Sequence, residues 1–218
     1  MSTILVVDDR PKERAKVVEL TRLSIPKNSG WKAEGIDPLP SKDDYPAHIV
    51  ENNVGVLVLD EKLQEQASAA TGVAVQYNGH ELVKFLRPYF PELPIFVVTA
   101  FDQEYELQNA ASEVEGIIPR MQFGKDPKTH TARMIRSGQR FSAAMKEDLI
   151  KLAELSKKVA VGAASDEDVH QMNGIREKLA LAFPTTDLTY AKDLIPKAEK
   201  LLETAQDLLE KIALGKKK

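Results

Sequence analysis

Acidic side chains follow two of the most apolar segments of the sequence. Asp8 and Asp9 come directly after residues 4–7, and Asp60 comes directly after residues 54–59. Both segments are rich in aliphatic and β-branched residues without alternation, which is typical of a strand covered on both faces in a parallel sheet. Ligand sites in such sheets lie at the carboxyl ends of the strands. We therefore expect the three carboxylates to meet at one edge of a sheet.

Three carboxylates in one place would repel each other and raise one another's pKa values unless a cation neutralises them. Mg²⁺ does this well, because a few carboxylates hold it while it keeps waters and binds phosphate oxygens. A carboxylate beside such an ion can also attack a phosphoryl group and form an aspartyl phosphate. The phosphoryl oxygens then require hydroxyl and cationic donors. Thr99, at the end of apolar residues 95–99, offers the hydroxyl, and Arg120 or Lys125 offers the cation.

The elements that must position these residues alternate between strand and helix patterns. Apolar segments predict strands at 4–7, 31–36, 54–59, 95–99 and 116–118. Helix patterns lie between them, at 11–24, 45–52, 80–89 and 104–112. In the first helix Ala15, Val18 and Leu23 form the expected apolar stripe. This alternation predicts an α/β fold, a doubly wound five-stranded parallel sheet with helices on both faces and right-handed crossovers.

Strand patterns stop after Lys125, and an all-α helical region is predicted for the rest of the chain. A helix is expected from Pro127 toward residue 137, with a break or kink at Gly138. Ser165 and Asp168 have the spacing of a capping box at the start of a later helix. The last segment has heptad-like spacing, which indicates a helical bundle that can also self-associate; its apolar positions are Leu194, Ala198, Leu201, Ala205, Leu208 and Ile212. We predict two domains, residues 1–137 and residues 138–218.

Composition excludes several classes of partner. The formal net charge is −3, which gives no general reason to expect nucleic acid or an anionic membrane. Residues 1–124 carry 12 basic and 19 acidic side chains, and residues 125–218 carry 18 and 14. No apolar run reaches membrane-spanning length, and the first residues resemble a strand rather than a signal peptide. Without cysteine there are neither disulfides nor thiolate metal sites, so we expect a cytoplasmic protein.

Together these residues resemble the receiver domain of two-component response regulators. The segment ILVVDD is similar to the acidic pair of the family's first strand, and VLVLD places Asp60 at the phosphorylated aspartate. The segment VVTA places Thr99 at the family's hydroxyl position, and NGHELVKFLR resembles its third helix. The four motifs occur in the family's order over residues 1–137. The resemblance implies a flavodoxin-like receiver fold for this part of the chain.

The resemblance also implies a function. Asp60 would accept a phosphoryl group from a histidine kinase, with Mg²⁺ held by Asp8, Asp9, Asp60 and the backbone carbonyl of Lys62. Thr99 would bind a phosphoryl oxygen. We expect a signalling protein rather than an enzyme, with output through contacts to a protein effector or through homodimerisation of the C-terminal helices. DNA is not an expected partner, because no C-terminal helix has the character of a DNA-recognition helix.

The chain departs from the family pattern in several places. Arg120 stands where the family has a lysine, and the proline that usually follows that lysine is missing. A guanidinium differs from an ammonium in reach and geometry. Ile117 stands where the family often has a switch aromatic, the Met-Pro pair after the phosphorylated aspartate is absent, and the loop 61–77 is long. These differences predict slow, long-lived or altered phosphorylation.

Three alternatives stay open at this point. A degenerate receiver would keep the fold and dock partners without phosphorylation. A phosphorelay intermediate or phosphate sink would exchange phosphate with a histidine; the segment of His170 with Gly174 resembles a histidine phosphotransfer signature. A haloacid-dehalogenase-like phosphatase would also use a strand-end aspartate with Mg²⁺, but it requires a second aspartate where this chain has Lys62.

Overall fold

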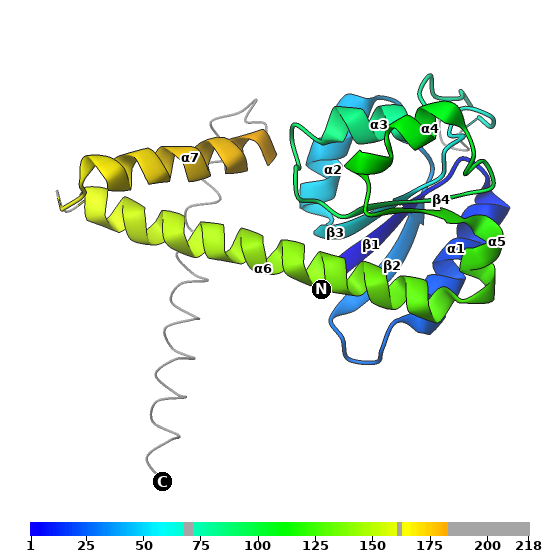
Figure 1. Ribbon diagram of the computed structural model, residues 1–218, viewed down its shortest axis with the longest axis horizontal. Coiled ribbons are helices and arrows are strands. Elements are labelled where there is room, and N and C mark those ends of the chain that lie inside the picture. The colour runs from blue at the N-terminus through cyan, green and yellow to red at the C-terminus, as the bar shows by residue number, and fades with distance from the viewer. Residues whose placement is uncertain (68–71, 161–162, 183–218) are drawn as a thin grey trace, which may run out of the picture. The chain divides into compact units, whose positions relative to one another are not determined.

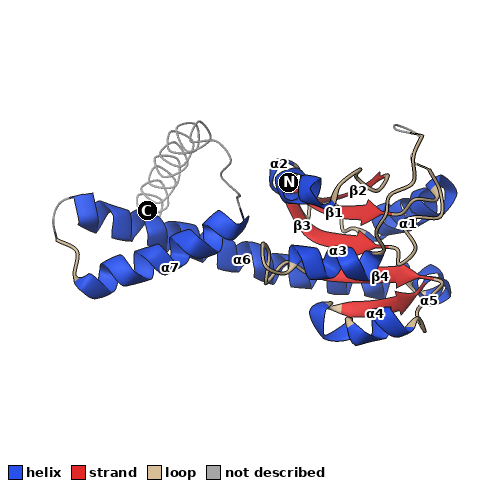
Figure 2. Ribbon diagram, turned by 90° about the horizontal axis from the view of Figure 1, so that it is seen from above, coloured by secondary structure: helices blue, strands red, loops and turns tan. Residues whose placement is uncertain are grey.

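The protein contains one parallel β-sheet. The computed structural model describes residues 1–67, 72–160 and 163–182. Its five strands lie in the order β2-β1-β3-β4-β5 and point in the same direction (Figures 1 and 2). They are β1 (Ser2–Val7), β2 (Trp31–Ile36), β3 (Val54–Leu59), β4 (Ile95–Thr99) and β5 (Gly116–Pro119). The predicted five-stranded parallel sheet is confirmed.

Helices connect the strands and cover both faces of the sheet (Figure 1). On one face lie α2 (Tyr45–Glu51) and α3 (Gly79–Leu86), with α4 (Tyr105–Asn109) beside α3. On the other face lie α1 (Pro11–Ser24), α5 (Arg120–Lys125) and the first part of α6 (Pro127–Ala160). Two short 3-10 helices span Lys42–Asp44 and Ala111–Glu113. This is the doubly wound arrangement that the sequence predicts.

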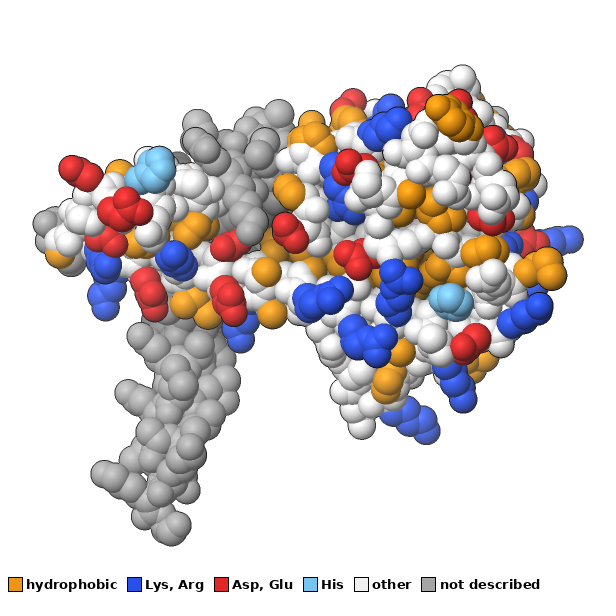
Figure 3. All heavy atoms as spheres, in the orientation of Figure 1, with side chains coloured by type: hydrophobic (Ala, Val, Ile, Leu, Met, Phe, Trp, Pro, Cys, Tyr) orange, Lys and Arg blue, Asp and Glu red, His pale blue; other side chains and the backbone are white. Residues whose placement is uncertain are grey.

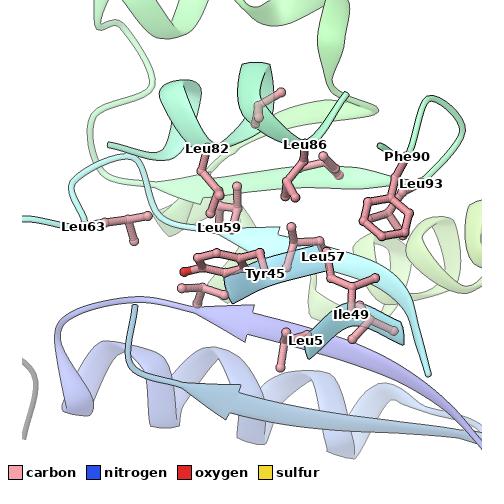
Figure 4. Close-up of a cluster of buried hydrophobic side chains, with 14 of the residues drawn as sticks. Leu5, Tyr45, Ile49, Leu57, Leu59, Leu63, Leu82, Leu86, Phe90 and Leu93 are labelled. Atoms are coloured by element: carbon pink, nitrogen blue, oxygen red, sulfur yellow. The ribbon is translucent and has the colours of Figure 1, made fainter. Parts of the chain in front are cut away.

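The central strand β3 is buried along its whole length, as its apolar sequence predicts. Because side chains alternate along a strand, Leu57 and Leu59 pack under α2 and α3, whereas Val56 and Val58 pack toward α1 and α6. Figure 4 shows the first of these layers, where Leu82 of α3 faces the strand. Because both faces of the strand are buried, only its ends can contact a ligand.

Helix α1 has the predicted bounds but a different buried face. Its buried residues are Val17, Val18 and Thr21, whereas Leu23 of the predicted stripe is 75% exposed. Ala15 is also exposed. The predicted stripe is confirmed at Val18 and wrong at Ala15 and Leu23. Thr21 is buried in addition, because its hydroxyl donates to the Val17 carbonyl at 2.7 Å inside the helix.

Helix α6 runs without interruption through Gly138, so the predicted break is wrong. Gly138 is instead a point of close approach between the helix and the sheet. A Cβ at this position would overlap the Trp31 ring and would lie 2.9 Å from the Gly55 carbonyl oxygen. The glycine is therefore explained by packing rather than by chain flexibility. The boundary predicted after residue 137 falls inside α6, and Met1–Phe183 form one compact unit; the two-domain division stays a prediction.

Beyond the sheet, α6 pairs with α7 (Asp166–Ala182) as a helical hairpin. The predicted capping box is confirmed: the Ser165 hydroxyl accepts from the Asp168 N–H at 3.1 Å, and the Asp168 carboxylate accepts from the Ser165 N–H at 3.0 Å. Leu155 and Met172 are buried in the hairpin. The predicted heptad-like seam between residues 194 and 212 lies outside the described residues. Among the described helices, none combines the length and apolar character needed to cross a membrane.

Candidate functional site

Three buried carboxylates meet at the carboxyl ends of β1 and β3, as predicted. Asp8, Asp9 and Asp60 are each at most 2% exposed. Each offers an oxygen within 4.8 Å of those of the other two. The Asp60 N–H donates to the Val7 carbonyl at 3.0 Å, which extends the pairing of β1 and β3 to their last residues. The register of the two strands thus places the acidic residues side by side.

Two arginines neutralise this carboxylate cluster. An Nη of Arg120 lies 2.8 Å from an Asp8 oxygen and 3.1 Å from Asp60 Oδ1. An Nη of Arg10 lies 2.7 Å from Asp60 Oδ2. Arg120 also pairs with Glu13 of α1 at 3.2 Å. Both oxygens of Asp60 are therefore covered by guanidinium groups, one from each side of the cluster.

The cluster also fits a hard divalent cation. Within the described residues, Asp9 Oδ1 is buried and has no hydrogen-bond partner, although Oδ2 accepts from the Gln66 N–H at 2.6 Å. A buried carboxylate oxygen without a donor carries a desolvation cost that a bound cation removes. Three carboxylate groups are also the donor set that Mg²⁺ prefers.

Burial changes the protonation of the cluster. Burial raises the pKa of Asp8, and the charge of Asp60 raises it further, whereas Arg120 works in the opposite direction. Burial likewise raises the pKa of Asp9, and the Gln66 N–H opposes it. For Arg120, burial works against the charged form, but the carboxylates of Asp60 and Asp8 outweigh it and raise the pKa. The negative charges of Asp8 and Asp9 thus destabilise the folded state at neutral pH.

Replacing Asp9 with asparagine is expected to stabilise the metal-free protein at pH 7. A carboxyl whose pKa is higher in the folded state binds more protons when folded, so its contribution to stability decreases as pH rises above the unfolded value of about 3.9. Asparagine removes this unfavourable charge and can still accept the Gln66 N–H. The gain over wild type should shrink as pH is lowered from 7 toward about 4, measured by urea unfolding followed by circular dichroism.

Asp166→Asn is the matched control, because Asp166 is exposed in the first turn of α7. It should give no comparable gain at pH 7. An Asp9→Asn protein that is less stable than wild type at pH 7 would show that the buried charge is not the dominant cost.

The structure separates the two candidate cations. Arg120 enters the cluster from the first turn of α5, a helix that the sequence did not predict. Lys125 is exposed at the end of the same helix.

Thr99 is buried at the end of β4, and its hydroxyl accepts from the Phe101 N–H at 3.1 Å. The ammonium of Lys62 pairs with Glu104 at 3.1 Å, which links the loops that follow β3 and β4.

Sequence reasoning missed three residues of the site. Arg10 directly follows the acidic pair, and that adjacency was an available signal. Glu61 directly follows Asp60 and is 1% exposed; its carboxylate accepts from the His80 N–H at 3.1 Å and lies 2.5 Å from Nδ1 of the same residue. Burial raises the pKa of Glu61, and His80 opposes this. No feature of the sequence indicated that Glu61 and His80 would contact each other.

The backbone after Asp60 is held by the start of α3. The Gly79 N–H donates to the Glu61 carbonyl at 2.8 Å. A Cβ at Gly79 would overlap the Asp60 carbonyl oxygen and lie 3.1 Å from Glu61 Cα. Only a glycine allows this close approach, so the helix fixes the position of the backbone beside the central aspartate.

Comparison with known proteins gives likeness of fold only. No protein-family model matches the sequence, and no curated protein matches it significantly. Among solved structures, a response regulator receiver domain protein from Clostridium thermocellum is 13% identical, covers 64% of this chain and 98% of its own, and has a TM-score of 0.46. The HemR receiver domain from Leptospira biflexa is 19% identical, covers 62% and 94%, and has a TM-score of 0.45.

NtrX from Brucella abortus is 19% identical with a TM-score of 0.48, and the match covers 66% of this chain but 29% of NtrX. At identities under 25% and TM-scores under 0.5, these similarities do not assign a fold or a function on their own. The strand order decides the fold, because 2-1-3-4-5 in a parallel sheet is the flavodoxin-like order, with the ligand site at the strand ends. The fold is flavodoxin-like. In this fold the carboxylate cluster occupies the edge where a ligand site is expected.

Proposed function

We propose that this protein is a response regulator that accepts a phosphoryl group on Asp60 from a histidine kinase. The observation that supports it most strongly is the convergence of Asp8, Asp9 and Asp60 in one buried cluster with Arg120 on its rim. The register of β1 and β3 brings these carboxylates together, and a phosphoryl-transfer site that holds Mg²⁺ would account for the cost of their mutual repulsion.

Asp60 is the nucleophile in this proposal. One of its carboxylate oxygens attacks the phosphorus atom of a phosphohistidine, the new P–O bond forms, and the P–N bond breaks to return the imidazole. Oδ1 is oriented by the Glu61 N–H at 2.9 Å. Oδ2 is covered by Arg10, whose side chain is 22% exposed and has to move away before this oxygen can react.

The other residues meet the charge of the phosphoryl group. Mg²⁺, when held by Asp8, Asp9, Asp60 and the Lys62 backbone carbonyl, would neutralise phosphoryl oxygens. Arg120 supplies the second cation, since it already reaches the Asp60 carboxylate. Thr99 donates its hydroxyl hydrogen to a phosphoryl oxygen, while its own oxygen accepts the Phe101 N–H.

The proposed protein works in the cytoplasm and signals through protein contacts. A receiver changes its surface when the phosphoryl group binds, and the exposed faces of α6 and α7 are available to an effector or to a second copy of the chain. DNA binding and enzymatic turnover are not part of this proposal.

Acetyl phosphate with Mg²⁺ provides the test. Wild type should gain the mass of one phosphoryl group in intact-mass spectrometry, and beryllium fluoride with Mg²⁺ should raise its melting temperature. Asp60→Asn should abolish both responses, because the amide cannot act as the nucleophile. Asp166→Asn, an exposed substitution of the same kind, should leave both unchanged.

No response in wild type would overturn the proposal. That result would favour a phosphorylation-independent scaffold. One observation supports such a scaffold: Arg10 already pairs with Asp60, and Arg120 already pairs with Asp8. Transfer of phosphate between Asp60 and His170, which is exposed on α7, would indicate a phosphorelay protein. Hydrolysis of a phosphate ester with turnover would indicate the phosphatase alternative.

A further inference from the structure

A second site lies on α6, apart from the carboxylate cluster. A pocket of about 680 Å³ is lined by residues of α6 and by Glu115, just before β5. Three arginines of α6 line it at helical positions i, i+3 and i+7, which lie on one side of a helix. Figure 3 shows basic side chains gathered along this part of α6. The residues are Glu115, Arg133, Arg136, Ser137, Gln139, Arg140 and Ala143.

The two outer arginines are held in place. The guanidinium of Arg133 lies 5.5 Å from the centre of the Phe96 ring, a cation–π contact, and donates to the Glu115 carbonyl. Arg140 donates to the Ser137 hydroxyl at 3.1 Å and lies 3.7 Å from the Glu115 carboxylate. Part of the cost of ordering Arg133 is therefore met before any ligand binds, whereas the Arg140 side chain stays 76% exposed.

The middle arginine, Arg136, is exposed and forms no ion pair with any of the described residues. Glu115 is the one acidic residue in the lining; its carboxylate accepts from the Ser137 hydroxyl at 3.1 Å and lies near Arg140. The Glu115 carboxylate therefore already occupies part of the pocket. Three cations against one carboxylate leave the pocket with an excess positive charge.

The surroundings limit which anion can bind. Residues 1–124, which contain all five strands, carry 19 acidic and 12 basic side chains. A long polyanion such as nucleic acid that extended from the pocket onto this part of the chain would be repelled, whereas a short acidic segment can stay within the pocket. Glu115 shows that a protein carboxylate fits among these donors.

The geometry points to a docking site for a short acidic segment of a partner protein, whose carboxylates bind Arg136 together with Arg133 and Arg140. The site is independent of phosphorylation at Asp60. Because Glu115 competes for the same donors, it limits the affinity of the pocket.

Isothermal titration calorimetry of the full chain with a peptide of alternating Glu and Ala, at low salt, tests the site. Wild type should bind, and Arg136→Gln should weaken binding about fivefold, as expected for the loss of one solvent-exposed charge pair. Lys146→Gln removes the same charge from an exposed position of α6 outside the pocket and should change affinity less than about twofold. Glu115→Gln should tighten binding, because it removes the internal competitor.

Three outcomes would overturn the proposal. They are failure of wild type to bind the peptide under these conditions, equal weakening of binding by Lys146→Gln and Arg136→Gln, and tighter binding of a duplex DNA than of the peptide. The second outcome would mean that only overall charge matters, and the third would assign the pocket to nucleic acid.

Discussion

Replacing Arg120 with methionine is expected to lower the free energy of unfolding by about 3 kcal/mol in metal-free buffer, the range for breaking a buried ion pair. The guanidinium is 13% exposed and contacts carboxylate oxygens of Asp8, Asp60 and Glu13. Without it, two of these carboxylates stay buried beside one another. Urea unfolding followed by circular dichroism measures the loss.

Mg²⁺ should recover part of that loss. In wild type the guanidinium and a bound Mg²⁺ would compete for the same oxygens, so removal of the side chain would leave more negative charge for the metal. The melting temperature of Arg120→Met should therefore rise more steeply with Mg²⁺ concentration than that of wild type. Lys125→Met, at the exposed end of the same helix, is the matched control and should change stability little. Equal effects of the two substitutions would contradict a role for Arg120 in neutralising the cluster.

Replacing Trp31 with alanine should cost about 3–5 kcal/mol, the usual cost of truncating a large buried aromatic residue. The ring is 6% exposed and lies over Gly55 of the sheet and Gly138 of α6. Neither glycine has a side chain that could fill the cavity left by the ring. Trp31→Phe keeps part of the contact and should cost about 1–2 kcal/mol.

Tyr105→Ala controls for the loss of an aromatic side chain, since Tyr105 is 73% exposed. Its unfolding free energy should stay close to that of wild type in urea unfolding followed by circular dichroism. A Trp31→Ala protein of nearly wild-type stability would show that α6 does not depend on this contact.

The sequence predicted the sheet well because its signal is local. Residues 54–59 are apolar at every position, and a strand of that kind is stable only when both faces are covered. The acidic cluster followed from the same reasoning, since residues at the carboxyl ends of parallel strands meet at one edge.

The predictions were wrong or incomplete where tertiary packing determines the local structure. Gly138 suggests a break on local propensity, but in the fold the glycine lets α6 contact β3 beside Trp31. The pairing of Arg10 with Asp60 joins residues fifty positions apart, and that of Glu61 with His80 joins residues nineteen apart. Such contacts depend on loop conformations that no periodic pattern encodes.

Trp31 is the sole tryptophan of the chain, and this has a practical consequence. Its indole reports on the junction between the sheet and α6, and Ser137 and Gln139, the neighbours of Gly138, line the arginine pocket. Movement of α6 away from the sheet would admit water to the ring and shift its fluorescence emission to longer wavelength. The protein thus contains an intrinsic optical probe of the junction between the sheet and α6 that needs no label.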